Sequence, residues 1–398
     1  MQTVYVVDAA RSAVGKYGGA LSGIRPDDLL ATVIKKLLAR NPNIDVNCID
    51  EVVAGAANQS GEDNRNVARM AALLAGLPVT VSGSTVNRLC ASGLQAIIDA
   101  SRQIACGDAE IVVACGVESM TRAPFVMAKT NAAFGRNLEW FDTTIGWRFT
   151  NPAMAALYYP HPMGETAENV AEQWKITREA QDEFAFASQT KYVHAHAAGL
   201  FKNEIIGIEI LGTKADAILF NTDEHPRLST LEKLAQLKPA FIKNGTVTAG
   251  NSSGINDGAA AIILAGEAAI KKFNLTPMAR IVSTGTAGVH PSIMGIGPVP
   301  ATQKALQKAG LKITDIDNIE LNEAFASQAL ACINVLPLDT TKVNIQGGSI
   351  AIGHPLGASG VRLSTTLLHS MQRNKQRWGL ATMCVGLGQG ASIIYERV

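Results

Sequence analysis

Leu89-Cys90-Ala91-Ser92-Gly93 and Leu356-Gly357-Ala358-Ser359-Gly360 share the pattern Leu-x-Ala-Ser-Gly at an offset of 267 residues (356 − 89). Two further pairs follow the same order: Ile49 to Val53 with Ile316 to Glu320 (316 − 49 = 267), and Val113 to Gly116 with Thr382 to Val385, whose cysteines are 269 residues apart (384 − 115). Three matches at nearly one offset indicate a duplicated structural unit. Two similar halves packed together would bring residues of both into one cleft.

Around these segments, short runs rich in Val, Ile and Ala alternate with amphipathic stretches. Val4 to Val7 is the first run with the character of a strand. Helical periodicity is found in the segments Asp27 to Leu38, Val67 to Leu74, Gly93 to Ile104 and Ala301 to Lys308. This alternation predicts an α/β fold, in which mixed or parallel sheets are covered by helices.

Residues 120–250 differ in composition from both halves, because they contain clustered prolines, several tryptophans and many of the lysines. This composition favours an inserted, loop-rich lid over a third copy of the repeat. We therefore predict three parts. An N-terminal half covers residues 1–119 plus about 251–275, the inserted domain covers 120–250, and a C-terminal half covers 276–398.

The overall composition excludes several functional classes. Charged residues make up only 17% of the 398 residues and the net charge is +1, so no global field attracts nucleic acid or an anionic membrane. The six cysteines lack C-x-x-C pairs and regular spacing, which argues against a disulfide framework or a zinc site. The sequence also lacks an apparent signal peptide or membrane span. We expect a cytoplasmic protein with free thiols.

Two segments carry candidate reactive groups. Cys90 follows a strand-like approach and precedes a helical run, and free N–H groups at a helix start would lower the pKa of its thiol. His354 lies in the glycine-rich segment Gly348 to Gly360, where a histidine could act as the base that activates Cys90. Taken alone, a buried structural cysteine and a structural loop histidine are the simpler interpretations.

Two further polar positions stand in apolar surroundings. Cys384 opens the glycine-rich turn Cys384 to Gly390, where a second thiol could serve as acid or base, or merely fill space at the end of a strand. Asn322, in Glu320 to Ala326, could hold a water, orient the histidine, or cap the following helix.

Together these segments resemble the thiolase family over essentially the whole chain. Four motifs are the basis of this resemblance, and they occur in the same order as in the family: the segment around Cys90, Asn322-Glu323-Ala324-Phe325, Gly353-His354-Pro355, and Cys384-x-Gly-x-Gly-Gln-Gly. The resemblance implies the thiolase fold, with two duplicated mixed-sheet halves packed as a layered α-β-α-β-α sandwich. It also implies an acyltransferase that needs no metal and no permanently bound cofactor.

The resemblance implies a role for each reactive residue. Cys90 would form an acyl-enzyme while His354 accepts its proton, and Cys384 would move the proton at the α carbon. One oxyanion hole would consist of His354 and a water held by Asn322. The other would consist of the backbone N–H groups of Cys90 and Gly386.

Acetyl-CoA, CoA and 3-oxoacyl-CoA are the substrates that the resemblance implies. Arg227 would lie against the adenine, and Ser253 would bond to the pantetheine arm. The remaining residues expected in the CoA channel are Met163, Ala249, Met294, Ala324 and Phe325. For Arg227, a solvated loop charge is the alternative. Family members are usually homodimers or homotetramers.

Features of the acyl pocket bear on the substrate. Ala91 and Leu387 replace glycines that are common in relatives. The stretch Val117 to Met127, followed by Asp142 to Phe149, resembles 3-oxoadipyl-CoA thiolases of aromatic catabolism. By contrast, His161-Pro162-Met163-Gly164 resembles the His-Met-Gly segment of acetoacetyl-CoA thiolases with a proline inserted, and leaves the role of His161 open.

Several functions compete with this interpretation. The leading prediction is thiolytic cleavage of 3-oxoacyl-CoA, or the reverse condensation of acetyl-CoA, as in fatty-acid β-oxidation. A 3-oxoadipyl-CoA-specific thiolase is the alternative. A ketoacyl synthase would typically use two histidines, and a silent lipid-binding protein would not need four reactive positions. A cysteine protease would leave Cys384 and the duplication unexplained.

Overall fold

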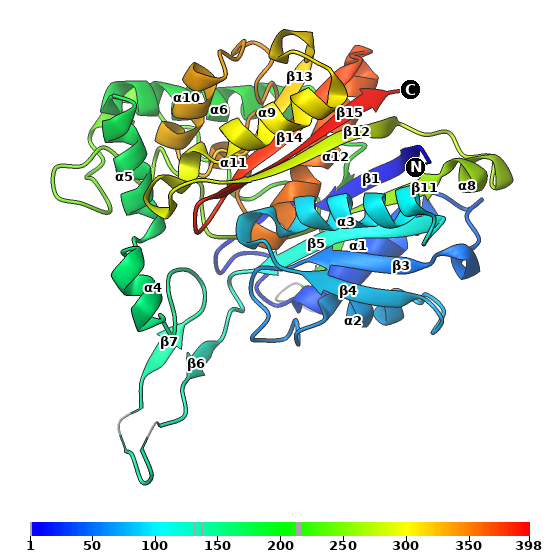
Figure 1. Ribbon diagram of the computed structural model, residues 1–398, viewed down its shortest axis with the longest axis horizontal. Helices are drawn as coiled ribbons and strands as arrows, with labels where there is room; N and C mark the ends of the chain where they lie inside the picture. The colour runs from blue at the N-terminus through cyan, green and yellow to red at the C-terminus, as the bar shows by residue number, and fades with distance from the viewer. Residues whose placement is uncertain (1, 131, 137, 212–216) are drawn as a thin grey trace.

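The computed structural model describes residues 2–130, 132–136, 138–211 and 217–398. In this part of the chain the strands of the main sheet follow the order β13-β14-β15-β12-β1-β11-β5-β3-β4 (Figure 1). Five of them come from the N-terminal half: β1 (Val4–Ser12), β3 (Glu51–Gly55), β4 (Ser82–Val86), β5 (Ile111–Ser119) and β11 (Asn256–Gly266). Strand β11 is buried along its whole length, and its apolar run Ala259 to Ala265 is typical of a strand covered on both faces.

The C-terminal half repeats the arrangement of the N-terminal half. Its strands are β12 (Ala279–Gly288), β13 (Asn318–Leu321), β14 (Trp378–Val385) and β15 (Gln389–Arg397). The order β12-β15-β14-β13 has the same parallel and antiparallel pairings as β1-β11-β5-β3. An isolated parallel bridge from Ile319 to Val343 takes the place of β4. The duplication read from the sequence is therefore present in the topology.

The two halves are joined edge to edge through a short contact between β1 and β12. Tyr5 pairs with Arg280, and Val6 pairs with Ala279. The two halves thus form one continuous sheet path that folds back on itself, rather than two separate sheets.

Helices cover the halves in layers (Figure 1). Helices α1 (Pro26–Ala39) and α2 (Val67–Leu74) pack on the outer face of the N-terminal half. Helices α3 (Ser92–Cys106) and α12 (Leu356–Asn374) lie between the halves, and α9 (Pro298–Ala309) and α10 (Ala326–Val335) cover the C-terminal half. Three large apolar clusters fill the spaces between these layers. The predicted α-β-α-β-α sandwich is confirmed, and so are the four helices expected from periodicity.

The central helices approach each other closely at two glycines related by the duplication. A β-carbon on Gly93 would lie 2.5 Å from the carbonyl oxygen of Gly357, and one on Gly360 would lie 2.1 Å from the backbone nitrogen of Leu94. Only glycine permits this contact. It brings the starts of α3 and α12, and so the segments of Cys90 and His354, side by side.

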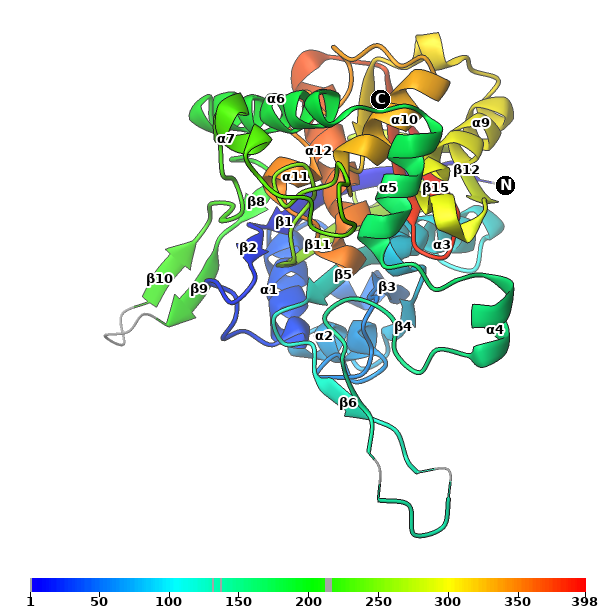
Figure 2. The ribbon, with the colours of Figure 1, turned by 90° about the vertical axis from the view of Figure 1, so that its left-hand side faces the viewer.

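The region between the halves is more helical than its composition suggested. It contains α4 (Pro152–Leu157), α5 (Met163–Gln173), α6 (Arg178–Ala197) and α7 (Leu231–Ala235), and two hairpins, β6–β7 (Phe125–Met127, Trp140–Asp142) and β9–β10 (Ile208–Leu211, Ala217–Phe220). Both hairpins extend from the body (Figure 2). Helix α6 has no apolar stripe in its sequence, because the side chains it buries include polar ones such as Gln181, Ser188 and Gln189.

The remaining short elements are β2 (Gly15–Lys16), β8 (Ile205–Ile206), α8 (Glu267–Lys272) and α11 (Ser349–Ile352). Among the residues described, no helix combines the length and the apolar character needed to span a bilayer. The same residues include no group of three or more His, Cys, Asp or Glu side chains arranged to hold a metal ion.

Candidate active site

Cys90 lies in a tight turn directly before α3. The 3-10 turn Leu89–Ala91 is held by Ser92, whose hydroxyl accepts from the Arg88 N–H (2.9 Å) and donates to the Leu89 carbonyl (2.6 Å). Leu89 has a φ of 47°, in the left-handed region. The turn leaves the Cys90 side chain half-buried at the start of the helix.

The electrostatics of Cys90 differ from the sequence expectation. Burial raises the pKa of the thiol to about 11, and the nearby Glu118 carboxylate raises it further. The N–H groups of Gly386 and of Cys90 itself hydrogen-bond to the sulfur and lower the pKa, but by less than burial raises it. The prediction of a lowered pKa was therefore wrong, because it counted the helix start and could not count burial.

His354 is buried and oriented by hydrogen bonds at three points. Its backbone N–H donates to Asn256 Oδ1 (3.0 Å), its Nδ1 lies 2.6 Å from Ser359 Oγ, and its Nε2 lies 3.4 Å from Asn322 Nδ2. Because the Ser359 hydroxyl donates to the Pro355 carbonyl (2.8 Å), Nδ1 must carry the proton. The lone pair is therefore on Nε2.

The imidazole is neutral at ordinary pH. Burial lowers the pKa of His354 to about 3, and the positive charge of Arg362 adds to this effect. A neutral ring with its lone pair on Nε2 is the form that accepts a proton.

Asn322 follows β13 and is fixed by its own partners. Its Oδ1 accepts from the Ser349 hydroxyl (2.7 Å), and that hydroxyl accepts from the Arg362 guanidinium (2.6 Å). These contacts turn the Nδ2 group toward His354. The N-cap of α10 is Phe325, so the alternative in which Asn322 caps the following helix is wrong.

Cys384 is buried near the end of β14, close to Cys90. Burial raises the pKa of its thiol well above the usual range, and the charge of Cys90 raises it further. Cys384 packs in an apolar cluster with four residues predicted for the CoA channel, namely Met163, Met294, Ala324 and Phe325. The structure therefore places the second thiol beside most of the predicted channel.

The other predicted CoA residues lie next to this cluster. The Ser253 N–H donates to the Ala324 carbonyl (3.0 Å). Arg227 donates to the carbonyls of Ala249 (2.8 Å) and Ser252 (3.1 Å), and burial lowers its pKa. Arg227 and Ala249 also line a separate hollow of about 320 Å³, together with Ala185, Phe186, Gln189, Ser229, Lys233, Leu234, Leu237 and Gly250.

A cavity of about 320 Å³ opens onto Cys90 and Gly386. Its walls come from both halves and from the inserted region, and the lining residues include Ala57, Asn58, Leu89, Glu118, Met120, residues 143–148, Pro162, Met163, Leu356 and Leu387. His354, Asn322 and Cys384 are not part of this lining. The stretch that resembled 3-oxoadipyl-CoA thiolases thus forms much of one wall.

His161 lies outside the cavity lining. Its Nδ1 is 3.1 Å from Glu165 Oε2, its ring packs edge-on against Tyr159, and its carbonyl accepts from Trp147 Nε1 (3.1 Å). The lining begins one residue later, at Pro162.

Sequence reasoning missed several residues of the site. Glu118 accepts from the backbone N–H groups of Ala57 (2.9 Å), Asn58 (3.0 Å) and Gly357 (2.8 Å). Its signal was a carboxylate inside the otherwise apolar strand β5. The contacts of Ser359 and Arg362 with the histidine network had no such signal, because they depend on the packing of α12.

The fold and site define an enzyme class with a cysteine at a helix start and a histidine from a duplicated half. Models of the thiolase N-terminal domain and the thiolase C-terminal domain match residues 4–268 and 275–397, and the chain belongs to the thiolase family. It is an acyltransferase of that family.

Named relatives cover the whole chain. It is 54% identical to the beta-ketoadipyl-CoA thiolase of Escherichia coli, with 100% of each chain covered. It is 55% identical to the beta-ketoadipyl-CoA thiolase of Pseudomonas aeruginosa, with 99% of each covered. The structure of human mitochondrial 3-ketoacyl-CoA thiolase in complex with CoA superimposes with a TM-score of 0.92 at 40% identity, covering 100% of this chain and 98% of the human one.

Proposed function

We propose that this thiolase cleaves 3-oxoadipyl-CoA with CoA, giving succinyl-CoA and acetyl-CoA. The observation that carries the proposal is the wall of the Cys90 cavity, which is built by residues 143–148. Two relatives at 54% and 55% identity bear the name beta-ketoadipyl-CoA thiolase. A role in fatty-acid β-oxidation stays a prediction.

In the proposed mechanism, Cys90 Sγ attacks the 3-keto carbon while His354 Nε2 accepts the thiol proton. The bond between C2 and C3 then breaks, and its electron pair leaves as the enolate of acetyl-CoA, which takes a proton from Cys384. The thiol of CoA next attacks the acyl carbon on Cys90 and gives its proton to the Cys384 thiolate. The bond between that carbon and Cys90 Sγ breaks, the Cys90 thiolate takes back the proton held by His354, and succinyl-CoA is released. The neutral states of Cys90, His354 and Cys384 at the start support this order of proton transfers.

Negative charge develops on a different oxygen in each half-reaction, so the mechanism needs two sets of donors. We assign the N–H groups of Cys90 and Gly386 to one, supported by their shared position at the sulfur. We assign Asn322 Nδ2, with a water, and His354 to the other, supported by their mutual orientation.

CoA is proposed to enter over the inserted region as a substrate. Arg227 and Ala249, which line the second hollow, would meet the adenine end, and Ser253 would meet the pantetheine. The apolar cluster of Met163, Met294, Ala324 and Phe325 would guide the thiol end toward Cys384. The human relative's structure with CoA supports this use of the fold.

A homodimer or homotetramer in the cytoplasm is also proposed. The β6–β7 hairpin extends from the body and exposes Phe125, Met127, Phe134 and Trp140, which supports self-association (Figure 1). Six unpaired cysteines suit a reducing compartment.

The domain limits at residues 119, 250 and 275 also stay a proposal.

A substrate comparison tests the proposed specificity. The purified protein is given free CoA with either 3-oxoadipyl-CoA or acetoacetyl-CoA, and loss of the enolate absorbance is followed. We expect a higher kcat/KM for 3-oxoadipyl-CoA. Equal or faster cleavage of acetoacetyl-CoA would reject the proposed substrate and leave the family assignment intact.

Labelling with radioactive acetyl-CoA tests the roles of the two thiols. The variant Cys90→Ser should lose acyl-enzyme formation, whereas Cys384→Ser should still become labelled but fail to make or break the carbon–carbon bond. Equal labelling of the wild type and Cys90→Ser would contradict the proposed nucleophile.

A further inference from the structure

Arg148 brings a positive charge to the cavity of Cys90. It is half-buried and lines the same cavity as Cys90, Gly386 and Leu387. Within the described part of the chain, its guanidinium has neither an ion pair nor a hydrogen bond. An anion in the cavity would find an unpaired guanidinium there, and a charge-assisted hydrogen bond is stronger at a partly buried site than in bulk water.

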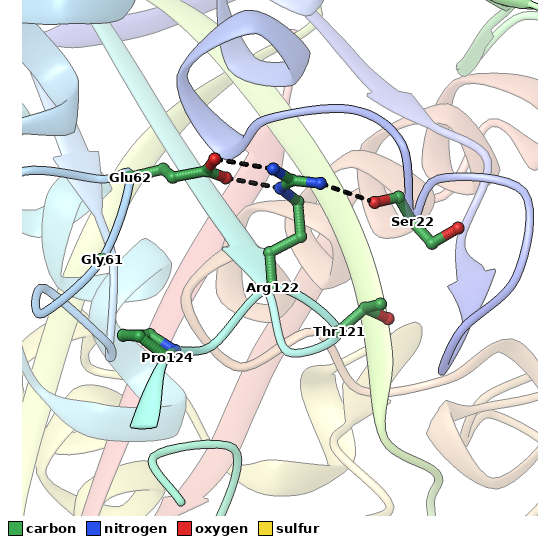
Figure 3. Close-up of a pocket in the computed structure, with 6 residues that line it drawn as sticks. All are labelled: Ser22, Gly61, Glu62, Thr121, Arg122 and Pro124. Carbon is green, nitrogen blue, oxygen red and sulfur yellow. Dashed lines mark hydrogen bonds and ion pairs between the residues drawn. The ribbon is translucent and has the colours of Figure 1, made fainter. Parts of the chain in front are cut away.

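Other arginines near the site are already engaged. Arg122, in a neighbouring hollow lined by Ser22, Gly61 and Pro124, forms two hydrogen bonds to Glu62 and one to the Ser22 carbonyl (Figure 3). Arg88 donates to Gln95 (2.7 Å) and Gln389 (2.9 Å). Their guanidinium groups therefore have protein partners, and Arg148 differs from them in this respect.

The segment that carries Arg148 is anchored on both sides of a turn. Thr143 accepts a hydrogen bond from Asn58 Nδ2 (2.9 Å) and donates to the Pro124 carbonyl (2.6 Å). Gly146 forms the turn with a φ of 87°, and the Trp147 indole donates to the His161 carbonyl (3.1 Å). These contacts hold the wall in place, so Arg148 is presented by a fixed backbone.

The carboxylate of Glu118, which lines the same cavity, already has hydrogen-bond partners. Both carboxylate oxygens of Glu118 accept backbone N–H groups, from Ala57, Asn58 and Gly357. Glu118 is thereby tied to the backbone, and Arg148 remains available to a ligand.

We propose that Arg148 binds the terminal carboxylate of the acyl chain and so selects 3-oxo-dicarboxylyl-CoA substrates. The inference rests on the proposed function. A guanidinium matches a carboxylate with two parallel hydrogen bonds, and such pairs are strong where water is excluded. An acyl chain ending in a methyl group leaves Arg148 unpaired, so the residue discriminates against it.

The test compares two substrates of equal chain length, 3-oxoadipyl-CoA and 3-oxohexanoyl-CoA, which differ in a terminal carboxylate. The variant Arg148→Met should lower kcat/KM for 3-oxoadipyl-CoA by about 10- to 100-fold, the cost of a lost charged hydrogen bond. For 3-oxohexanoyl-CoA, kcat/KM should stay level or rise. Arg148→Lys keeps the charge without the planar fork, so it should lose less than Arg148→Met.

The control variant Lys271→Met removes one positive charge from the exposed face of α8, beyond the far end of β11. It should behave like the wild type with both substrates. Exchange of labelled CoA into acetyl-CoA reports whether Arg148→Met still folds and acylates, because acetyl-CoA has no terminal carboxylate.

The outcomes separate the two proposals. If the wild type prefers 3-oxoadipyl-CoA and Arg148→Met keeps that preference, the role of Arg148 is rejected while the proposed function stands. If the wild type prefers 3-oxohexanoyl-CoA, the proposed substrate is rejected and the role of Arg148 with it. Parallel losses for both substrates and for acetyl-CoA exchange would show a structural role only, and would also reject the inference.

Discussion

Two leucines beside the reactive groups have backbone conformations that leucine rarely adopts. Leu89 precedes Cys90 with a φ of 47°, and Leu387 follows Gly386 with a φ of 64°. Each of these left-handed conformations costs about 1–2 kcal/mol relative to a right-handed one. Strain of this kind persists only where the surroundings enforce it, and here it sets the N–H groups at the Cys90 sulfur.

Leu387 allows this strain to be measured. The variant Leu387→Gly should be more stable than Leu387→Ala by about 0.5–1 kcal/mol, the reverse of the usual order, because glycine alone adopts the left-handed conformation without penalty. Both variants lose the same partly exposed side chain apart from one methyl group. Urea unfolding of the pair provides the measurement, and a more stable alanine variant would show that no strain is stored there.

At this scale the motifs selected candidate residues, whose roles stay a prediction, but they did not predict the chemical state of these side chains. Cys90, His354, Asn322 and Cys384 could be selected from their segments, since each is a reactive side chain in a small or apolar setting. The thiol pKa could not be predicted, because burial contributes more than the helix start and depends on residues far along the chain. Arg148 was part of a quoted stretch, but only the cavity shows what its side chain lines.

Among the elements, β5 carries a buried carboxylate, Glu118, near its C-terminal end. Glu118 connects the segment after β3, at Ala57 and Asn58, with the start of α12 at Gly357. One carboxyl group in the lining of the Cys90 cavity thus joins the two halves. Burial raises its pKa to about 7, although the three N–H donors oppose the shift.

This raised pKa makes stability depend on pH. The folded state favours the neutral carboxyl, so its contribution is complete below about pH 4.5 and is lost as the pH rises through about 7. Urea unfolding at pH 5, 6.5 and 8 should show wild-type stability falling by up to about 3 kcal/mol relative to Glu118→Gln, which does not titrate. Burial also raises the pKa of Glu320, to about 8. Glu320 titrates in both proteins, so its contribution cancels in the difference between their free energies of unfolding. A constant difference between the two proteins would contradict the shift.

Elements with a regular apolar pattern were predicted well, and those stabilised by polar contacts were not. Helix α2 matches its predicted bounds, Val67 to Leu74, because its apolar face meets the N-terminal core. Helix α6 has no such face. It is held by bonds such as Ser188 to Glu323 (2.7 Å) and Gln189 to the Ile350 carbonyl (3.0 Å), whose partners lie more than a hundred residues away.

On the scale of the whole molecule, a buried ion network fastens the inserted region to the N-terminal half. Arg11 of β1 contacts Glu204 (2.7 Å) and forms a two-pronged pair with Asp223 (2.7 and 3.0 Å), and all three side chains are fully buried. Glu204 also accepts from Thr366 of α12 (3.0 Å). Three parts of the chain therefore meet in one buried network.

Removing the Arg11 guanidinium should strongly destabilise the folded protein. The variant Arg11→Met leaves two buried carboxylates without their counter-charge and should lower the free energy of unfolding by about 3–5 kcal/mol. Arg40→Met is the matched control, because its pair with Asp8 (2.9 Å) is partly exposed and should cost about 0–1 kcal/mol. Thermal and urea unfolding give both values. Similar losses for the two variants would mean that burial adds nothing to the network.

The duplication was visible in the sequence, but the way the halves join was not. Matching glycines and small residues recur at one offset because both copies need the same close contact between α3 and α12. The junction of β1 with β12 rests on backbone pairing at Tyr5, Val6, Ala279 and Arg280, and backbone pairing leaves no pattern in side chains.

The central position of β1 also bears on how the chain is made. Val4 pairs with Gly266, so β1 finds its main neighbour only after 262 further residues (266 − 4) have been synthesised. At about 5–20 residues per second, this interval lasts on the order of tens of seconds. Throughout that time the nascent chain holds an apolar strand with open edges, which other chains could join.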